Sequence, residues 1–346
     1  MPDYRVAIVG TGVEDGGGDE GFAMGYRHAA AFASHPACEI VACADVVPEH
    51  ANRFADAYGL PSAAAHTDHV KLVKTHEPDI VSVATPIPTH AAIVADCVDA
   101  GPPVAIHCEK PMSNRWNEVV AMVDGCAAAN VQLTINHQLR LSEPVRLARE
   151  LIENGRIGAV RRVEGARGDL YEAGIHQLDL CTYFAGDVSA SWVMGSIDFR
   201  DGGRRSGMLI EDQATGLWEF TNGIFGLMAT GDGQDAIGSI NRVIGDAGEI
   251  AIDFWHEDPL RLRQDGEGWQ SIECSYGVPI ETAIEDIVSA LENGREPVIS
   301  GANAKRGAEI AFGIYESVRQ RARIDLPLTI EDDPLAALVE RGRLGS

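Results

Sequence analysis

Residues 4–12 read Tyr-Arg-Val-Ala-Ile-Val-Gly-Thr-Gly, a short apolar run that ends in a glycine pair. Such a run is typical of a buried parallel strand, and a Gly-x-Gly turn after it is typical of a loop that binds phosphate groups. A second run, residues 39–44, ends at Asp45, and the stretch between them, residues 25–32, has helical composition. The order strand, glycine turn, helix, strand and acid predicts the first βαβ unit of a dinucleotide-binding fold.

The glycine motif is irregular after Gly12. In the plain Gly-x-Gly-x-x-Gly pattern the third glycine would stand at position 15, which is Asp15. Gly25 is the better candidate, and it implies an insertion of ten residues (25 − 15). Its distance of 20 residues (45 − 25) from Asp45 suits an acid that binds the adenosine ribose. We expect the acidic insertion, residues 13–24, to loop away from the phosphate groups.

Two further apolar runs end in polar residues. Residues 79–84 lead into Thr85-Pro86, and residues 103–107 lead into Glu109-Lys110. In open α/β sheets, ligands bind at the carboxyl ends of parallel strands. These two strand ends are therefore predicted to face the cofactor.

The length of 346 residues favours two domains. With a run at 131–135, at least five strand–helix units are counted, enough for a complete dinucleotide domain. We therefore predict a Rossmann domain over residues 1–135 and a second α/β domain over residues 136–346. Short alternating runs predict strands in the latter at 190–199, 213–220, 223–230, 248–253 and 260–264, completed by helices at about 280–293 and 303–322.

Composition restricts the classes of function. The formal net charge of −24 argues against nucleic acid as a partner, because phosphate backbones are bound by clustered Lys and Arg. No apolar run approaches the roughly 18–20 residues that span a bilayer, and the N-terminus reads into a strand, so we expect a cytoplasmic protein without a membrane partner. The seven cysteines are scattered and never form Cys-x-x-Cys, which favours reduced thiols over disulfides or a zinc site.

These motifs resemble the Gfo/Idh/MocA superfamily, which includes glucose-fructose oxidoreductase and inositol dehydrogenases. The resemblance rests above all on Glu109-Lys110-Pro111 and on residues 168–179, where an acid, Glu172, is followed four residues later by His176. It extends over residues 4–330. It implies an N-terminal Rossmann domain and a C-terminal α/β domain with a large, mostly antiparallel open sheet. It also implies a homodimer or homotetramer, since that sheet often forms the interface.

Hydride transfer from an alcohol requires a base for the hydroxyl proton and a group that stabilises the developing alkoxide. On a helix beginning near Tyr171, Glu172 and His176 would be i and i+4 and share one face. We expect His176 to be the general base, Lys110 to stabilise the alkoxide, and Glu172 to orient the histidine or bind a substrate hydroxyl. Family members usually carry aspartate where this chain has Glu172, so the substrate of well-known members does not transfer.

The expected cofactor is NAD. The carboxylate of Asp45 would accept a hydrogen bond from the ribose 2'-hydroxyl of NAD and would repel the 2'-phosphate of NADP. NADP is therefore the less favoured alternative. His90 is expected either to cap a helix or to contact the nicotinamide side. The residues expected to bind the cofactor are Gly10, Thr11, Gly12, Gly25, Asp45, Thr85, Pro86, His90 and Glu109.

Substrate contacts are expected from Lys110, Glu172 and His176, and from Asn136 and Arg140 near the predicted domain junction. No metal site is expected, because His66 and His69 lack a third ligand at suitable spacing.

Three functions stay open at this point. The first is a dehydrogenase of a sugar, polyol or related alcohol with exchanging NAD. The second is an enzyme that keeps NAD bound and uses transient oxidation for hydrolysis or elimination on a glycoside. The third is a non-catalytic NAD-binding sensor, which the acid–base set of Lys110, Glu172 and His176 disfavours.

Overall fold

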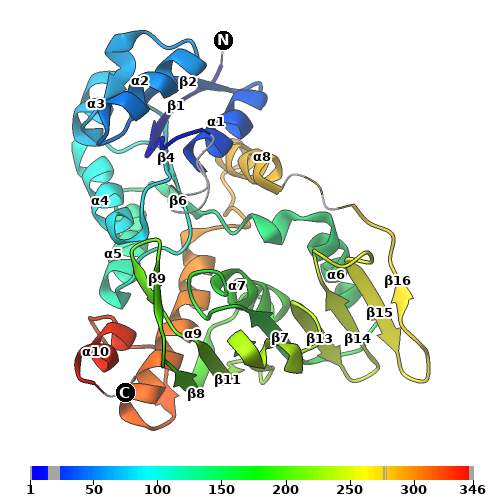
Figure 1. Cartoon of the computed structure of the whole chain (residues 1–346). Coiled ribbons are helices and arrows are strands. Elements are labelled where there is room, and N and C mark those ends of the chain that lie inside the picture. Colours follow the sequence, from blue (N-terminus) through cyan, green and yellow to red (C-terminus); the bar gives the residue numbers. More distant parts are fainter. Residues whose placement is uncertain (1, 15–23, 276, 278, 343–346) are drawn as a thin grey trace. The chain divides into compact units, whose positions relative to one another are not determined.

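The computed structural model describes residues 2–14, 24–275, 277 and 279–342, so most of the predicted 13–24 insertion lies outside the described residues. The chain divides into two compact units (Figure 1). Unit 1 comprises Met1–Asn114, Glu118–Gln138 and Pro279–Gly301, and unit 2 comprises Arg115–Asn117, Leu139–Val278 and Ala302–Ser346.

Unit 1 contains a six-stranded parallel sheet with the order β3-β2-β1-β4-β5-β6. This is the doubly wound dinucleotide-binding topology, in which the strand order reverses between β1 and β4. The five predicted strands, which are β1, β2, β4, β5 and β6, are confirmed to within one or two residues at each end, and the short strand β3 was not predicted. Their bounds are Tyr4–Val9 (β1), Cys38–Ala44 (β2), Ala65–His66 (β3), Ile80–Val83 (β4), Ala105–Cys108 (β5) and Gln132–Ile135 (β6).

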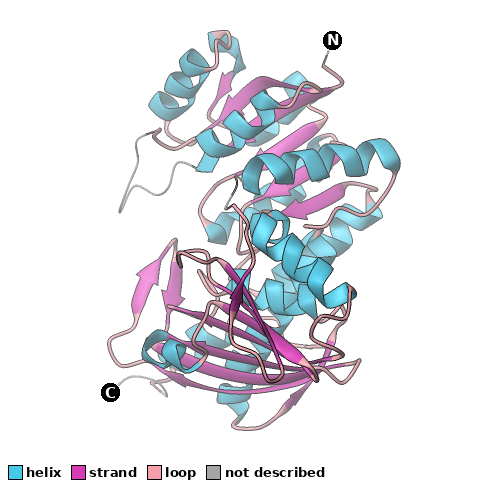
Figure 2. Ribbon diagram, turned by 90° about the vertical axis from the view of Figure 1, so that its right-hand side faces the viewer, coloured by secondary structure: helices cyan, strands magenta, loops and turns pink. Residues whose placement is uncertain are grey.

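Helices cover this sheet (Figure 2). Strands β4 and β5 are buried along their whole length, as expected for parallel strands covered on both faces. The helices are Met24–Ser34 (α1), Pro48–Ala57 (α2), His69–His76 (α3), His90–Ala100 (α4), Trp116–Ala128 (α5) and Pro279–Asn293 (α8).

Helix α8 corrects one expectation. It was predicted to complete the C-terminal domain, but it packs against α1 in unit 1. The segment that follows it pairs with β6, where the N–H of Ile135 donates to the carbonyl of Ile299 at 3.0 Å. An amphipathic pattern predicts that a helix is buried on one side, but it does not predict which sheet covers that side.

Unit 2 is built on a nine-stranded sheet with the order β16-β15-β14-β13-β7-β12-β11-β8-β17. Only β7 and β12 are paired in parallel, so the predicted mostly antiparallel sheet is confirmed. The strands are Val160–Arg167 (β7), Ala190–Asp198 (β8), Gln213–Phe220 (β11), Phe225–Thr230 (β12), Asn241–Gly245 (β13), Gly248–Ile252 (β14), Leu260–Gln264 (β15), Gln270–Ser271 (β16) and Ile324–Asp325 (β17).

Helices and one small hairpin complete unit 2. Helix α7 packs on β7 and β13, and the side chains of β11 alternate between buried and partly exposed positions. The helices are Glu143–Glu153 (α6), Ile175–Phe184 (α7), Gly301–Gln320 (α9) and Pro334–Glu340 (α10); the hairpin consists of Gly203–Arg205 (β9) and Met208–Ile210 (β10). In the part of the chain that the structure describes, no helix is long and apolar enough to cross a membrane.

Candidate active site

The turn after β1 brings the backbone close to other segments of unit 1. Gly10 and Gly12 have φ values of +87° and +62°, in the left-handed region that favours glycine. A Cβ on Gly10 would lie 2.6 Å from Cγ2 of Thr85, and a Cβ on Gly25 would lie 2.4 Å from the carbonyl oxygen of Gly10. The first turn of α1 therefore packs directly against the glycine turn, and Gly25 occupies the place of the third glycine.

The Asp45 carboxylate follows β2 and faces this turn. Its Oδ2 accepts the N–H of Gly12 at 2.9 Å and the hydroxyl of Thr11 at 3.2 Å, and its Oδ1 accepts the N–H of Val47 at 2.9 Å. A Cβ on Gly12 would meet no atom of the described residues within 4 Å, so among these residues the turn is open beside the carboxylate. An acceptor fixed next to an open glycine turn fits the adenosine ribose and pyrophosphate of NAD.

The segment after β4 is held by its own hydrogen bonds. The Thr89 hydroxyl lies 2.7 Å from the carbonyl oxygen of Pro86 and 2.8 Å from the hydroxyl of Thr85. His90 is fully buried, with Nε2 at 2.8 Å from the carbonyl oxygen of Thr85 and Nδ1 at 2.9 Å from that of Pro111.

The role expected for His90 needs correction. Burial lowers the pKa of its imidazole, although the two neighbouring carbonyls act in the opposite direction. Both ring nitrogens face main-chain carbonyls and the ring has no exposed surface, so it neither caps α4 nor reaches a nicotinamide. Instead it ties the loop after β4 to the segment after β5.

Lys110 follows β5 and is partly exposed, whereas its neighbour Glu109 is 7 % exposed. One carboxylate oxygen of Glu109, Oε2, accepts the main-chain N–H of Lys110 at 3.2 Å. The other, Oε1, lies 2.8 Å from Nε2 of His28 and 2.6 Å from the amide nitrogen of Asn136. On the other side of the imidazole, Nδ1 of His28 is 2.9 Å from the hydroxyl of Ser82.

Glu109 is a buried carboxylate. Burial raises the pKa of its carboxyl group, but the hydrogen bond and charge of His28, with contributions from Lys110 and Asn136, outweigh burial and hold the pKa well below its usual range. Asn136, expected to contact the substrate, is 1 % exposed and its amide nitrogen is committed to Glu109. We therefore assign Asn136 to this network in place of the substrate contact.

His107, on β5, is also buried beside this network. Its ring centroid lies 4.8 Å from that of His28, and its Nδ1 lies 3.0 Å from the hydroxyl of Thr134. Burial lowers the pKa of His107 to about 3, so the ring is neutral. Within the described ranges, no group of three or more His, Cys, Asp and Glu side chains could hold a metal ion.

In unit 2, the segment with Glu172 and His176 differs from the sequence-based expectation. Helix α7 begins only at Ile175, so Glu172 lies in the turn before the helix and does not share a helical face with His176. Asp169 explains the delay, because its Oδ1 accepts the N–H of Ala173 at 2.8 Å. A short acidic side chain that bonds the nearby backbone in this way favours a turn over a helix.

Glu172 faces the β9–β10 hairpin. Its Oε1 lies 3.3 Å from the hydroxyl of Ser206, and its Oε2 lies 3.4 Å from Nη1 of Arg205. His176 is partly exposed, and apart from Tyr183 every other side chain of α7 is buried. A partly exposed imidazole on an otherwise buried helix can be reached for proton transfer.

The buried carboxyl group of Glu211 binds the backbone of the segment that leads to Glu172. Glu211 is 3 % exposed, its Oε1 accepts the N–H of Leu170 at 2.5 Å, and its Oε2 accepts the hydroxyl of Tyr315 at 2.9 Å. Burial raises the pKa of Glu211 to about 7. Burial also raises the pKa of Asp169, so two carboxyl groups with raised pKa values hold the backbone around Glu172.

Arg140 has a structural role in unit 2. Its side chain is 0 % exposed, and it pairs with both carboxylate oxygens of Asp179 at 2.7 and 2.8 Å and with Asp187 at 2.8 Å. Nη2 also lies 3.1 Å from the hydroxyl of Thr182. No exposed surface is left for the substrate contact expected of Arg140, and the Asp179 carboxylate is bound to arginine.

Several residues near the candidate site were not singled out from the sequence. Some lie within or beside the motifs but are not their characteristic residues, and for the buried ones the only available signal was a polar residue at a core position. For example, His28 lies on the buried face of α1, between Tyr26 and Ala29. The residues missed in this way are His28, Ser82, Asp169, Arg205, Ser206, Glu211 and Tyr315.

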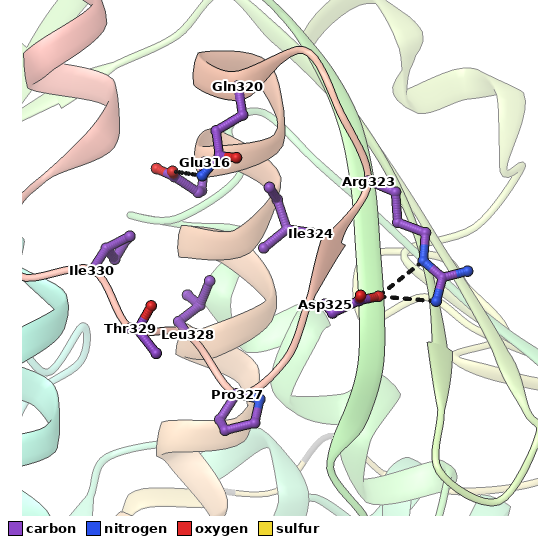
Figure 3. A pocket seen from close by; sticks show the side chains of 9 residues that line it. All are labelled: Glu316, Gln320, Arg323, Ile324, Asp325, Pro327, Leu328, Thr329 and Ile330. Carbon is purple, nitrogen blue, oxygen red and sulfur yellow. Dashed lines mark hydrogen bonds and ion pairs between the residues drawn. The ribbon is translucent and has the colours of Figure 1, made fainter.

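A surface hollow of about 230 Å³ lies elsewhere in unit 2, between α9 and the segment that follows it (Figure 3). Its polar lining includes Glu316, Gln320 and an Arg323–Asp325 ion pair at 2.9 Å. None of the expected site residues lines it, so we do not assign the chemistry to this hollow.

Comparison with known proteins gives consistent matches over both units. Two models of the GFO_IDH_MocA family match the chain, "oxidoreductase family, NAD-binding Rossmann fold" over residues 4–137 and "oxidoreductase family, C-terminal alpha/beta domain" over residues 166–326. The inositol 2-dehydrogenase of Rhizobium meliloti (strain 1021) is 23 % identical, with 88 % of this chain and 96 % of the relative covered.

Two further proteins span nearly the whole chain. The levoglucosan dehydrogenase of Pseudarthrobacter phenanthrenivorans is 24 % identical, with 94 % of this chain and 99 % of the relative covered. The crystal structure of an aldose-aldose oxidoreductase from Caulobacter crescentus, complexed with glycerol, has a TM-score of 0.77 at 20 % identity and covers 94 % of this chain and 100 % of its own. At that identity the structural match establishes the fold.

Proposed function

This chain belongs to the Gfo/Idh/MocA oxidoreductase family, and from that premise we propose that it oxidises an alcohol carbon of a sugar, polyol or related compound with NAD. The names of its relatives, an inositol dehydrogenase and a levoglucosan dehydrogenase, support this substrate class. The glycine turn and Asp45 support NAD as the cofactor. The cytoplasmic location expected from the sequence stays a prediction.

In the proposed reaction, the glycine turn and Asp45 would hold NAD, which when bound would supply the hydride acceptor for the alcohol carbon. The imidazole of His176 takes the hydroxyl proton, so that the carbon–oxygen bond becomes a carbonyl. The ammonium group of Lys110 stabilises the negative charge that develops on the oxygen. Glu172, next to Ser206 and Arg205, holds a neighbouring substrate hydroxyl or orients the histidine.

One observation carries this proposal. Lys110 and His176 are partly exposed titratable side chains on otherwise buried backbone, Lys110 after β5 and His176 on α7. A titratable side chain with this partial exposure can reach a bound substrate, which a fully buried one cannot. Both residues also stand in the motifs by which the family resemblance was identified.

The direct test measures NADH formation at 340 nm by the purified protein with NAD and a panel of sugars, polyols and sugar acids, at low and high salt. We expect at least one compound to be oxidised, and we expect the rate to vanish in the His176→Ala variant. If no compound gives NADH but NAD is found in the denatured protein, internal-redox hydrolysis or elimination would be favoured. Reversible NAD binding without any reaction would favour a sensor, and no NAD affinity would refute the cofactor.

The preference for NAD over NADP can be reversed at the end of β2. In the double variant Asp45→Ser/Val46→Arg, we expect the KM for NAD to rise by about 10-fold or more and NADP to be used. The serine removes a charged acceptor for the ribose hydroxyl, and the arginine supplies a cation at a position that is 86 % exposed. Steady-state kinetics with both cofactors measure the change.

Asp56→Ser is the matched control, because Asp56 is an exposed acid on the helix that follows Asp45. It should leave both KM values unchanged. An unaltered NAD preference in the double variant would contradict the role proposed for Asp45.

We also propose that a second copy of the chain covers the open face of the sheet in unit 2. Met194 on β8 and Phe225 on β12 are 47 % and 40 % exposed there, and Leu217 on β11, the strand between them, lies opposite Met194 and Leu227. Exposed apolar groups in one patch are typical of an association surface.

Light scattering coupled to size exclusion should therefore give a mass of two or four chains of 37.0 kDa. Met194→Glu should shift the mass towards one chain, because it would bury an unpaired charge in the interface. Val104→Glu, at a position 45 % exposed in unit 1, should leave the mass unchanged. A monomeric wild-type protein would refute the proposal.

A further inference from the structure

A buried network connects helix α1 to the main chain of Lys110. Its members are His28 on α1, Asn136 after β6, and the carboxylate of Glu109, whose second oxygen accepts the Lys110 N–H. We propose that His28 and Asn136 are positioning residues, which act through Glu109 to fix the place of Lys110. The proposal rests on the function proposed for Lys110, but the network can be tested without that function.

The two carboxylate oxygens of Glu109 bind different partners. Oε1 receives His28 at 2.8 Å and Asn136 at 2.6 Å, while Oε2 receives the main-chain N–H of Lys110 at 3.2 Å. A carboxylate that is 7 % exposed cannot rely on water and needs donors on both oxygens. Loss of the donors at Oε1 would let the carboxylate rotate or take up a proton, and either change would weaken the bond to Lys110.

His28 is itself held in one orientation. Its Nδ1 lies 2.9 Å from the hydroxyl of Ser82 on β4, and its ring packs against His107 of β5 at a centroid distance of 4.8 Å. His107 is in turn bonded to Thr134 of β6 at 3.0 Å. The donor that holds Glu109 is therefore fixed by three neighbouring strands.

The network ends on Lys110, and this distinguishes it from ordinary core packing. On the other side of Lys110, the carbonyl of Pro111 lies 2.9 Å from Nδ1 of the buried His90. The main chain is thus held before and after the lysine, while the lysine side chain stays partly exposed. Such anchoring matters because a displacement of about 1 Å can reduce the rate of a positioned reaction by about 100-fold.

The first readout is amide hydrogen exchange of Lys110 in protein labelled with 15N only at lysine. The chain has four lysines, so the spectrum contains few signals, and Lys71, Lys74 and Lys305 serve as internal references. In His28→Phe we expect the Lys110 amide to exchange at least about 10-fold faster, because its acceptor is no longer held. The other three amides should keep their wild-type rates.

The second readout is kinetic. In His28→Phe we expect kcat to fall by about 10- to 100-fold while KM for the alcohol and for NAD changes by less than about 2-fold. His28→Gln keeps an amide donor that can reach Glu109, and it should restore a large part of both kcat and the slow Lys110 exchange. Asn136→Ala removes one of the two donors at Oε1 of Glu109. It should lower kcat and speed up the exchange of the Lys110 amide in the same direction as His28→Phe, but by smaller factors.

His35→Gln is the matched control. His35 follows the other end of α1 and pairs with Glu285 at 3.3 Å, without a described bond to Glu109. It should change neither the exchange of the Lys110 amide nor kcat.

The outcomes separate the two proposals. If the wild type oxidises no alcohol, the function proposed above fails, and the Lys110 amide still decides whether the network holds the lysine. The positioning role is refuted if Lys110 exchange in His28→Phe equals that of the wild type. It is also refuted if His28→Phe and His28→Gln lower kcat equally and both lower the melting temperature. A general loss of packing would then explain the fall in kcat.

Discussion

Replacement of Lys110 with alanine is expected to lower kcat by about 100- to 1,000-fold, with a change of less than about 3-fold in the affinity for NAD. The ammonium group stabilises charge on the alcohol oxygen, and that charge is larger in the transition state than in the bound substrate. Because the loss is confined to the transition state, it should appear in kcat. NADH formation at 340 nm, together with NAD titration, measures both quantities.

Lys74→Ala is the control for this result. Lys74 is an exposed lysine in the last turn of α3, so its loss should change kcat by less than about 2-fold. Lys110→Arg should recover only part of kcat, because a planar guanidinium does not place its charge where an ammonium does. A Lys110→Ala variant with wild-type kcat would contradict the mechanism.

Replacement of Arg140 with methionine should destabilise unit 2 by about 3–5 kcal/mol. Asp179, which is 1 % exposed, would keep a buried charge without the guanidinium that now binds both of its oxygens. Guanidinium unfolding followed by tryptophan fluorescence measures the loss, since Trp192, Trp218, Trp255 and Trp269 all belong to unit 2.

Two comparisons make this prediction specific. The double variant Arg140→Met/Asp179→Leu should be more stable than Arg140→Met alone, because it leaves no unpaired buried carboxylate. Arg149→Met is the matched control, since Arg149 stacks on the same Tyr183 ring at 5.1 Å but pairs with the exposed Glu153. Its loss should cost about 1 kcal/mol or less, and equal losses for Arg140 and Arg149 would contradict the argument.

Local patterns predicted the elements of the dinucleotide-binding fold well. Strands β1 and β2 lie where the apolar runs 4–9 and 39–44 predict them, and α1 begins one residue before Gly25. Parallel strands buried on both faces need continuous apolar runs, and this requirement is visible in the sequence. The start of α7 could not be predicted in this way, because Asp169 competes for the backbone that a helix would use.

The candidate site was predictable only in part. Lys110, Glu172 and His176 stand in motifs, so the resemblance identified them. The residues that support these segments from a distance could not be identified in this way, because Glu109 is bound by His28, 81 residues earlier in the chain, and Leu170 by Glu211, 41 residues later. Hydrogen bonds between such distant positions leave no periodic pattern.

The sequence by itself determined the βαβ order and the family, because these depend on apolar periodicity and short motifs, and the resemblance to that family implied the mostly antiparallel second sheet. Only the tertiary structure decided that α8 belongs to unit 1 and that His90 binds main-chain carbonyls. It also decided that Arg140 pairs with the buried Asp179 and that Asn136 binds Glu109. The three polar residues share one physical reason. A polar side chain in the core must find a partner, and the fold decides which distant residue that partner is.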